Sequence, residues 1–284
     1  EHALVLDLYA EKDTHWNDSS YSGGKEFQKT PWVYCMLNNF GGRMGLHGHM
    51  DNIVSGVVDA ANNSEMLTGI GITPEGSQNN PILYDLLFET VWCDDATKTL
   101  TEIDTDQWLK DYVTRRYGAT SESAYEAMKI LENTVYKASL TMRGQGAPES
   151  YINARPAESI GAASTWGNAV IGYDMEELEK AAELLLEDYD TLKKSAGYLY
   201  DLADVLKQVL SNSSQKYHRE MVSAYRSGDI AKFNEASDQF LSLIDKVEEV
   251  LGTRKEFLFG TWTEQAKKLA EGDDDFTKDI YELN

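Results

Sequence analysis

The chain has 284 residues, of which 42% are hydrophobic, so it has ample apolar material for one large or two smaller cores. Its formal net charge of −22 argues against binding to nucleic acid or to an anionic membrane, because both surfaces would repel it. No apolar run reaches the about 18 residues that a transmembrane helix needs, so we expect no membrane insertion.

The first region, residues 1–93, combines short apolar runs with helical patterns. Three runs, Leu4–Tyr9, Trp32–Leu37 and Met66–Ile72, have the near-continuous apolar character of strands that are covered on both faces. Helical patterns follow the second and third runs, at Leu46–Ala61 and Pro81–Trp92. This alternation predicts βα units that share a parallel sheet.

The second region, residues 94–284, consists of one helical pattern after another, interrupted by a long loop at about Arg143–Asn168. Gly228 and Asp229 have the character of a helix stop followed by an N-cap. We therefore predict an α/β region followed by an all-α domain. The expected helices lie at Thr101–Tyr117, Ser121–Tyr136, Asp174–Asp188, Tyr198–Tyr225, Ile230–Leu251, Thr253–Gly272 and Phe276–Leu283.

Three βα units are too few to close a (β/α)8 barrel, which needs roughly 250 residues. An isolated sheet of three parallel strands would leave two open edges. We therefore expect residues 1–93 to supply the last strands of a TIM-type barrel, whose missing N-terminal part, together with any leader, lies elsewhere. The final helical pattern has no stop signal, so we expect the helical domain to be incomplete at its end.

Candidate catalytic residues follow the predicted strands. In parallel α/β barrels the active site lies at the C-terminal ends of the strands. Glu11 follows the first strand and Glu75 follows the third, whereas Cys35, Leu37 and Asn39 lie at the end of the second. Two carboxylates at strand ends suit glycoside hydrolysis, in which one attacks the anomeric carbon and the other protonates the leaving oxygen. An acidic loop residue can equally cap a helix, so spacing alone leaves both interpretations open.

Other kinds of site find little support. The glycines of Gly41–Gly48 match neither phosphate-binding pattern and suit a tight strand-to-helix turn. His47, His49 and Asp51 could suggest a metal, but residues two apart on a helix do not share a face. No G-x-S-x-G motif is present. We therefore expect neither a metal nor a cofactor.

Several motifs occur in order from one end of the chain to the other. They lie at Leu6–Glu11, Pro31–Gly42, Gly69–Asn79, Arg115–Gly118, Ala154–Pro156, Tyr200–Leu202, Lys207–Gln208, Gly260–Ala266 and Tyr281–Asn284. Together they resemble glycoside hydrolase family 89, the α-N-acetylglucosaminidases. The resemblance covers the whole chain. It implies a retaining exo-glycosidase that removes terminal α-linked N-acetylglucosamine and that has a barrel followed by a helical domain.

The resemblance also assigns roles to residues. The glutamate of the family's Pro-Glu-Gly turn is the nucleophile, which places that role on Glu75. The acid/base glutamate belongs to an Asn-Glu motif upstream, and no match to that motif exists here, so we expect this chain alone to be inactive. Two residues depart from the family pattern: Asn38 stands where relatives often carry His, and Tyr34 replaces a frequent Trp. We expect both to alter the pocket wall.

The expected substrate site comprises Cys35 and Leu37, which we predict to line the sugar pocket, with Asn39 and Glu11 as further contacts. Barrel packing is the alternative role for the first two. A degenerate sugar-binding or scaffold protein, an inverting glycosidase and a different hexosaminidase remain alternative functions. The charge of −22 favours a neutral, mucin-type glycan over a sulfated one. The expected location is extracellular or periplasmic in a bacterium and lysosomal in a eukaryote.

Overall fold

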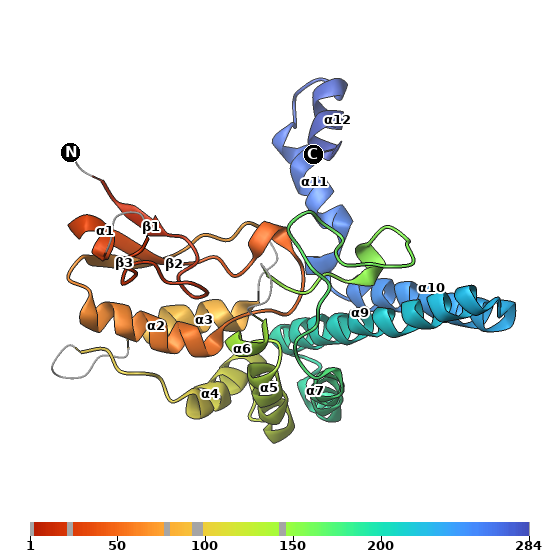
Figure 1. Ribbon diagram of the computed structural model, residues 1–284, viewed down its shortest axis with the longest axis horizontal. Helices are drawn as coiled ribbons and strands as arrows, with labels where there is room; N and C mark the ends of the chain where they lie inside the picture. The colour runs from red at the N-terminus through yellow and green to blue at the C-terminus, as the bar shows by residue number, and fades with distance from the viewer. Residues whose placement is uncertain (1–2, 22–24, 77–79, 93–98, 142–145, 284) are drawn as a thin grey trace.

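The computed structural model contains a small parallel sheet at the N-terminal end, followed by helices (Figure 1). The strands are β1 (Val5–Asp7), β2 (Trp32–Met36) and β3 (Leu67–Ile72), and they lie in the order β1-β2-β3. Both pairs are parallel, so the three strands end at one edge of the sheet. The structure describes residues 3–21, 25–76, 80–92, 99–141 and 146–283.

Two helices, α2 (Met50–Asn63) and α3 (Pro81–Thr90), cover one face of this sheet, as the βα pattern predicts. Two short elements complete the region, α1 (Glu26–Lys29) and the 3-10 turn η1 (Phe40–Gly42). The expectation that the strands are covered on both faces is met along most of β2, where four of the five residues are buried, but it is wrong for β1 and β3. Large apolar side chains stay exposed in and beside the strands, at Leu4, Leu6, Leu8 and Ile72.

The apolar pattern predicted that helix α2 begins at Leu46, but the helix begins at Met50. The chain before it is extended and bonds to a distant segment: the Gly48 amide donates to the Val135 carbonyl, and the Met50 amide donates to the Tyr136 carbonyl. Apolar periodicity cannot reveal such long-range bonds. Because of these bonds, the residues just before Met50 form no helical turn and instead connect the sheet region to the helical region.

The helical region agrees with most of the predicted ranges. Asp104, Ser121 and Asp174 cap the starts of three helices by accepting a backbone N–H. Gly228, with φ of +73°, ends α9, and the Asp229 side chain caps α10, which confirms the predicted stop and start. The elements are α4 (Thr105–Tyr117), α5 (Glu122–Asn133), α6 (Ala138–Thr141), η2 (Tyr151–Asn153), α7 (Met175–Glu187), α8 (Tyr189–Leu192), α9 (Ala196–Ser227), α10 (Ile230–Gly252), η3 (Lys255–Phe257), α11 (Phe259–Leu269) and α12 (Asp275–Leu283).

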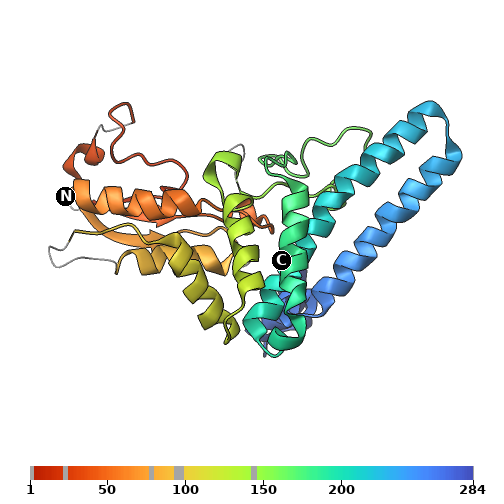
Figure 2. The same cartoon turned by 90° about the horizontal axis from the view of Figure 1, so that it is seen from below.

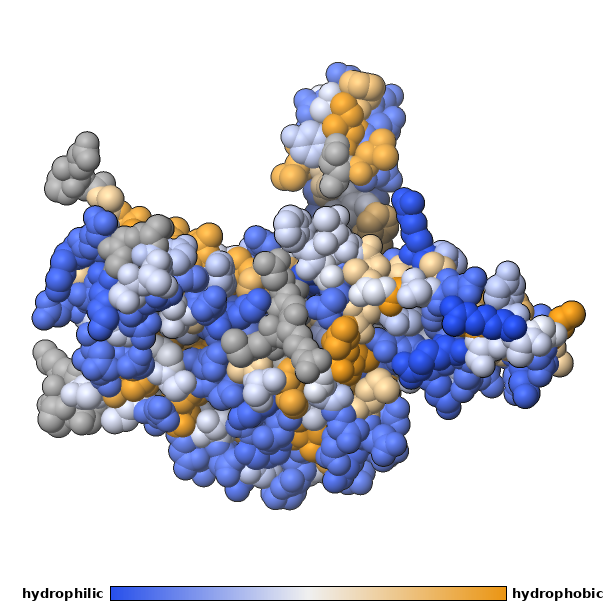
Figure 3. Space-filling model, in the orientation of Figure 1, coloured by the Kyte–Doolittle hydropathy of each residue, from blue (hydrophilic) through white to orange (hydrophobic). Residues whose placement is uncertain are grey.

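The long helices α9 and α10 form an antiparallel hairpin that extends away from the sheet (Figure 2). Helix α11 begins at Phe259, later than predicted, because the 3-10 turn η3 precedes it. Helices α11 and α12 project from the rest of the molecule, and hydrophobic side chains gather on their surface (Figure 3). Phe259, Leu269 and Phe276 are among the large apolar side chains exposed there. None of the described helices is long and apolar enough to cross a membrane.

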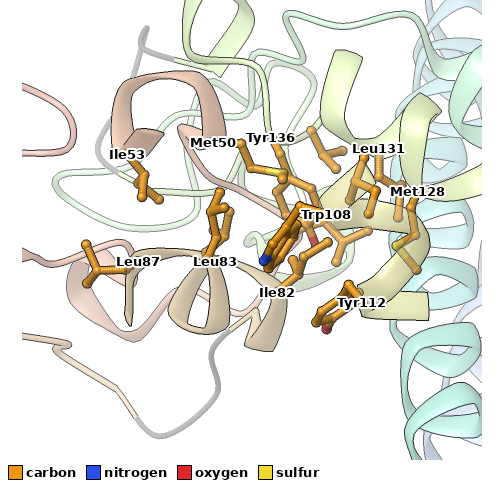
Figure 4. Close-up of a cluster of buried hydrophobic side chains, with 14 of the residues drawn as sticks. Met50, Ile53, Ile82, Leu83, Leu87, Trp108, Tyr112, Met128, Leu131 and Tyr136 are labelled. Atoms are coloured by element: carbon orange, nitrogen blue, oxygen red, sulfur yellow. The ribbon is translucent and has the colours of Figure 1, made fainter. Parts of the chain in front are cut away.

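One buried hydrophobic cluster joins the sheet region to the helical region (Figure 4). Met50 and Ile53 of α2 and Leu83 of α3 belong to the same cluster as Trp108 of α4 and Leu131 of α5. The expected boundary between residues 93 and 94 falls within 93–98, outside the described residues, and it stays a prediction. The shared core fixes the strand ends relative to the helical region.

Candidate active site

Hydrogen bonds bring the three strand ends together. The Ala10 amide donates to the Cys35 carbonyl over 3.0 Å, and the Thr73 amide donates to the Met36 carbonyl over 2.9 Å. The Thr73 hydroxyl also donates to the Leu8 carbonyl over 2.7 Å. The loops that carry the predicted site residues therefore lie side by side at one edge of the sheet, where parallel α/β folds place their active sites.

Glu75 lies in the turn after β3, and its side chain is exposed. The Gly41 amide donates to its carboxylate Oε2 over 2.6 Å, and its own amide donates to the Asn39 carbonyl over 3.2 Å. A Cβ at Gly76 would lie only 2.8 Å from Cα of Gly42, so the two turns pack directly against each other. The carboxylate is thus held by the neighbouring turn and stays open to a ligand. The last residues of this motif, 77–79, lie outside the described residues.

Glu11 has the opposite environment. Its residue is only 1% exposed, and its carboxylate accepts the amide of Leu37 at 3.2 Å and that of Asn38 at 2.8 Å. Burial raises the pKa of Glu11 to about 7, although these amide bonds act to lower it. The nearby charge of Asp7 raises it further. This placement favours a supporting role under the end of β2, and direct contact with a sugar stays a prediction.

The three other predicted contacts lie close to these carboxylates. Cys35, Leu37 and Asn39 are each at most 5% exposed. Side chains alternate along a strand, so Cys35 points to the opposite face of β2 from Trp32 and Met36, which belong to the core shared with α2 and α3. Burial, followed by the charges of Asp7 and Glu11, raises the pKa of the Cys35 thiol. The structure gathers all five predicted residues at one edge, and their roles toward a sugar stay predictions.

The two departures from the family pattern have different placements. Tyr34 is fully buried against α2, where its hydroxyl would lie 3.0 Å from a Cβ at Gly56. The expectation that Tyr34 alters the pocket wall is wrong, because side chains alternate along a strand and this one points to the helices. Asn38, with φ of +51°, begins the turn that leads to Gly41. Asparagine tolerates this left-handed conformation better than most residues.

The glycine turn lies where it was predicted, whereas His47 and His49, which the apolar pattern placed on a helix, precede α2. Gly41 has a φ of +62°, which confirms the tight turn. His47 and His49 are buried with their rings 5.1 Å apart, and burial lowers the pKa of His49 to about 4. Asp51 instead forms an ion pair with Lys137 at 3.1 Å. Within the described part of the chain, no cluster of three or more His, Cys, Asp or Glu side chains could hold a metal.

Comparison with family models matches the chain along nearly its whole length. Residues 108–284 match the alpha-N-acetylglucosaminidase (NAGLU) C-terminal domain, and residues 1–94 match the tim-barrel domain of the same family. The chain belongs to the α-N-acetylglucosaminidase family, glycoside hydrolase family 89. This confirms the resemblance found in the sequence. The family models also support a fragment of a TIM-type barrel followed by a C-terminal domain, which is helical here.

Individual members of the α-N-acetylglucosaminidase family are similar to this chain in sequence and in structure. Human alpha-N-acetylglucosaminidase is 33% identical over 99% of this chain and 35% of its own length. A family 89 glycoside hydrolase from Clostridium perfringens, solved in complex with PUGNAc, is 43% identical with a TM-score of 0.90. A variant from the same organism, with two glutamates replaced by glutamine, was solved with its substrate GlcNAc-α-1,4-galactose; it is 44% identical with a TM-score of 0.90. Each of these two matches includes 98% of this chain but only 30% of the Clostridium chain.

One further feature of this α-N-acetylglucosaminidase family chain was not predicted from its sequence. Beside the Glu75 turn lies a cleft of about 350 Å³ between the barrel fragment and the helical domain. Its lining includes Arg43, Glu149, Lys207 and Phe257. Arg43 and Glu149 form an ion pair at 3.4 Å although they are 106 positions apart. The only local sign of this ion pair in the sequence was an arginine directly after two glycines. Nothing in the sequence pointed to Glu149 as its partner.

Proposed function

We propose that this chain is the C-terminal part of a retaining exo-glycosidase that removes terminal α-linked N-acetylglucosamine, with Glu75 as the nucleophile. The observation that carries the proposal is an exposed carboxylate at the end of β3, held by the Gly41 amide. The Clostridium relative, in which two glutamates were replaced for a complex with its substrate, supports a reaction that uses two carboxylates. Exposure suits Glu75, because a nucleophile has to reach the anomeric carbon.

In this mechanism the Glu75 carboxylate attacks the anomeric carbon and forms a covalent glycosyl-enzyme. A second carboxyl group, about 5–5.5 Å away in retaining enzymes, protonates the leaving oxygen and then takes a proton from the attacking water. We assign that group to the N-terminal barrel part, the partner that completes the site. Cys35, Leu37 and Asn39 would line the sugar pocket, and Glu11 would support it from beneath through the amides of Leu37 and Asn38.

The test is Glu75→Gln in the full-length enzyme. Glutamine keeps the shape and can still accept the Gly41 amide, but it cannot attack the anomeric carbon. We expect normal folding and a loss of turnover by several orders of magnitude on an aryl α-N-acetylglucosaminide. Glu126→Gln, an exposed carboxylate on α5, serves as the control and should keep full activity. Turnover of Glu75→Gln above about a tenth of the wild-type value would exclude the role and would favour a different acid or a different hexosaminidase mechanism.

We propose a neutral, mucin-type glycan as the natural substrate. The support is the net charge of −22, with 48 acidic side chains against 26 basic ones, because such a surface repels a sulfated chain at long range. The proposed location follows from such substrates: extracellular or periplasmic in a bacterium, lysosomal in a eukaryote.

A further inference from the structure

The turn from Asn38 to Arg43 sets the direction of the Glu75 carboxylate. The Gly41 amide donates to Oε2 of Glu75 over 2.6 Å. Three residues of this turn, Asn38, Gly41 and Gly42, have φ values of +51°, +62° and +69°. The left-handed conformation is unfavourable for an L-amino acid such as Asn38, and the two glycines can adopt many other backbone conformations. The turn therefore does not hold this shape by itself. Contacts from outside the turn have to fix it.

Arg43, the last residue of the turn, makes such a contact with Glu149 of the helical domain. Its Nη1 donates to the Phe40 carbonyl over 3.3 Å, which closes the turn on itself. Its Nε donates to Oε1 of Glu149 over 3.4 Å. The side chains of Arg43 and Glu149 are only 11% and 8% exposed, so water screens this pair weakly. The planar guanidinium can hold both partners at once, since its donors form a rigid fork.

Glu149 is itself fixed by the loop that precedes α7. Its Oε2 accepts the amides of Ala163 at 2.7 Å and Ser164 at 3.1 Å, and its own amide donates to the Asn168 carbonyl at 2.8 Å. Burial alone would raise the pKa of Glu149, but these hydrogen bonds and the charge of Arg43 bring it below its usual value. A Cβ at Gly167 would lie 2.1 Å from Cδ of Glu149, so the loop closes tightly around this carboxylate.

We propose that Arg43 and Glu149 are a positioning pair: they fix the η1 turn, and through the Gly41 amide they orient the Glu75 carboxylate for attack. The helical domain thereby takes part in catalysis through the loop of residues 146–168, although neither residue of the pair need touch the sugar. This inference rests on the proposed function, because it matters only if Glu75 is the nucleophile. Misplacing a reacting group by about 1 Å can cost about 100-fold in rate, so a contact of this kind is measurable.

The first test is Glu149→Gln in the full-length enzyme. The amide oxygen can still accept from Ala163 or Ser164, so the loop keeps its shape, but the charge that holds Arg43 is lost. We expect kcat to fall about 100-fold while KM changes by less than about threefold, because orientation of the nucleophile acts on the chemical step and not on sugar binding. A merely structural pair would not separate kcat from KM in this way.

The second variant is Arg43→Lys, which keeps the charge but loses the fork. Lysine cannot bond both the Phe40 carbonyl and Glu149 in the same geometry, so we expect a smaller loss of kcat, about tenfold. Asp201→Asn is the matched control. It breaks the Arg116–Asp201 ion pair, 2.6 Å long with side chains 20% and 12% exposed, which joins α4 to α9. The control should lower Tm and leave kcat unchanged at temperatures below its transition.

The outcomes separate this inference from the proposed function. If Glu149→Gln keeps a kcat within about twofold of wild type while its Tm falls as far as that of Asp201→Asn, the pair is structural only and the inference is overturned. If Glu149→Gln does not fold, a wild-type kcat for Arg43→Lys overturns it equally. Full activity of Glu75→Gln would instead overturn the proposed function. An inactive Glu75→Gln beside a fully active Glu149→Gln would remove the positioning role alone.

Discussion

Two carboxylates at the same edge of the sheet have opposite environments. Glu11 is buried and accepts the amides of Leu37 and Asn38, whereas Glu75 is exposed and accepts the amide of Gly41. A buried carboxylate is stable only when donors compensate its lost hydration, and here the donors belong to the end of β2. The buried group therefore shapes the loop, and the exposed group is the one that a substrate can reach.

The raised pKa of Glu11 predicts a pH dependence of stability. Its pKa is about 7 when folded against 4.5 ordinarily, so between these values the folded chain holds a proton that the unfolded chain has released. Stability should therefore fall as pH rises through this window, by about 3 kcal/mol in total. Glu11→Gln removes this contribution. We expect its stability relative to wild type, from urea unfolding, to be more favourable at about pH 7 than at about pH 4.5.

The control for this measurement is Glu249→Gln, an exposed carboxylate on α10. Its effect on unfolding should be small at both ends of the window. An effect of Glu11→Gln that is the same at both pH values would show that the Glu11 carboxyl titrates alike in the folded and unfolded chain, contrary to its burial.

The sequence predicted that the candidate residues lie together at the strand ends, but it did not predict the contacts between them. Strand ends in a parallel sheet have to meet, which is why Glu11, Cys35 and Glu75 could be placed together in advance. The bond from the Gly41 amide to Glu75 depends on how two turns pack, and no local pattern encodes that. The direction of Tyr34 could have been predicted from strand alternation, because its neighbours Trp32 and Met36 face the helices as well.

Among the elements, the turns after β2 and β3 act as one unit. They meet where Gly76 packs on Gly42, with a bond from the Glu75 amide to the Asn39 carbonyl beside this contact. The sequence predicted most helices, because apolar periodicity and caps such as Asp104 and Ser121 are local. It misplaced the start of α2, because long-range bonds from Gly48 and Met50 decide that boundary.

The close contact of the two turns predicts the effect of Gly76→Ala. A Cβ there would lie 2.8 Å from Cα of Gly42 and 3.1 Å from the side chain of Asn39, so one turn has to move. Glu75 moves with it, and we expect kcat of the full-length enzyme to fall by about tenfold or more. Gly252→Ala is the control, since a Cβ at that position of α10 meets nothing within 4 Å. Wild-type kcat for Gly76→Ala would show that the two turns do not fix the nucleophile.

For the molecule as a whole, a shared core and an acidic surface are the main features. The core shown in Figure 4 continues from α2 and α3 into α4 and α5, so the barrel fragment and the helical domain hold one another in place. The sequence predicted both regions but not this continuity, because contacts between distant segments leave no periodic signal. The exposed apolar face of the sheet, with Leu4 and Leu6, is the side that the helices leave uncovered.

The net charge of −22 predicts how salt affects substrate choice. Two glycans with the same terminal sugar, one neutral and one sulfated, should compete for the full-length enzyme across a salt series. Repulsion acts over about 30 Å at 10 mM salt but only about 8 Å at 150 mM. We expect the sulfated glycan to have the lower kcat/KM at low salt and to gain on the neutral one as salt rises. A higher kcat/KM for the sulfated glycan at low salt would contradict the electrostatic argument.

We expect the exposed carboxylate after β3 to become covalently bonded to the sugar during the reaction. A fluorinated trapping derivative of N-acetylglucosamine that keeps the 2-acetamido group should react with the full-length enzyme and leave one glycosyl group, located by mass spectrometry of its peptides. We expect that group on Glu75 and no labelling of Glu75→Gln. Stable labelling of another carboxylate, with Glu75 unmodified, would contradict it.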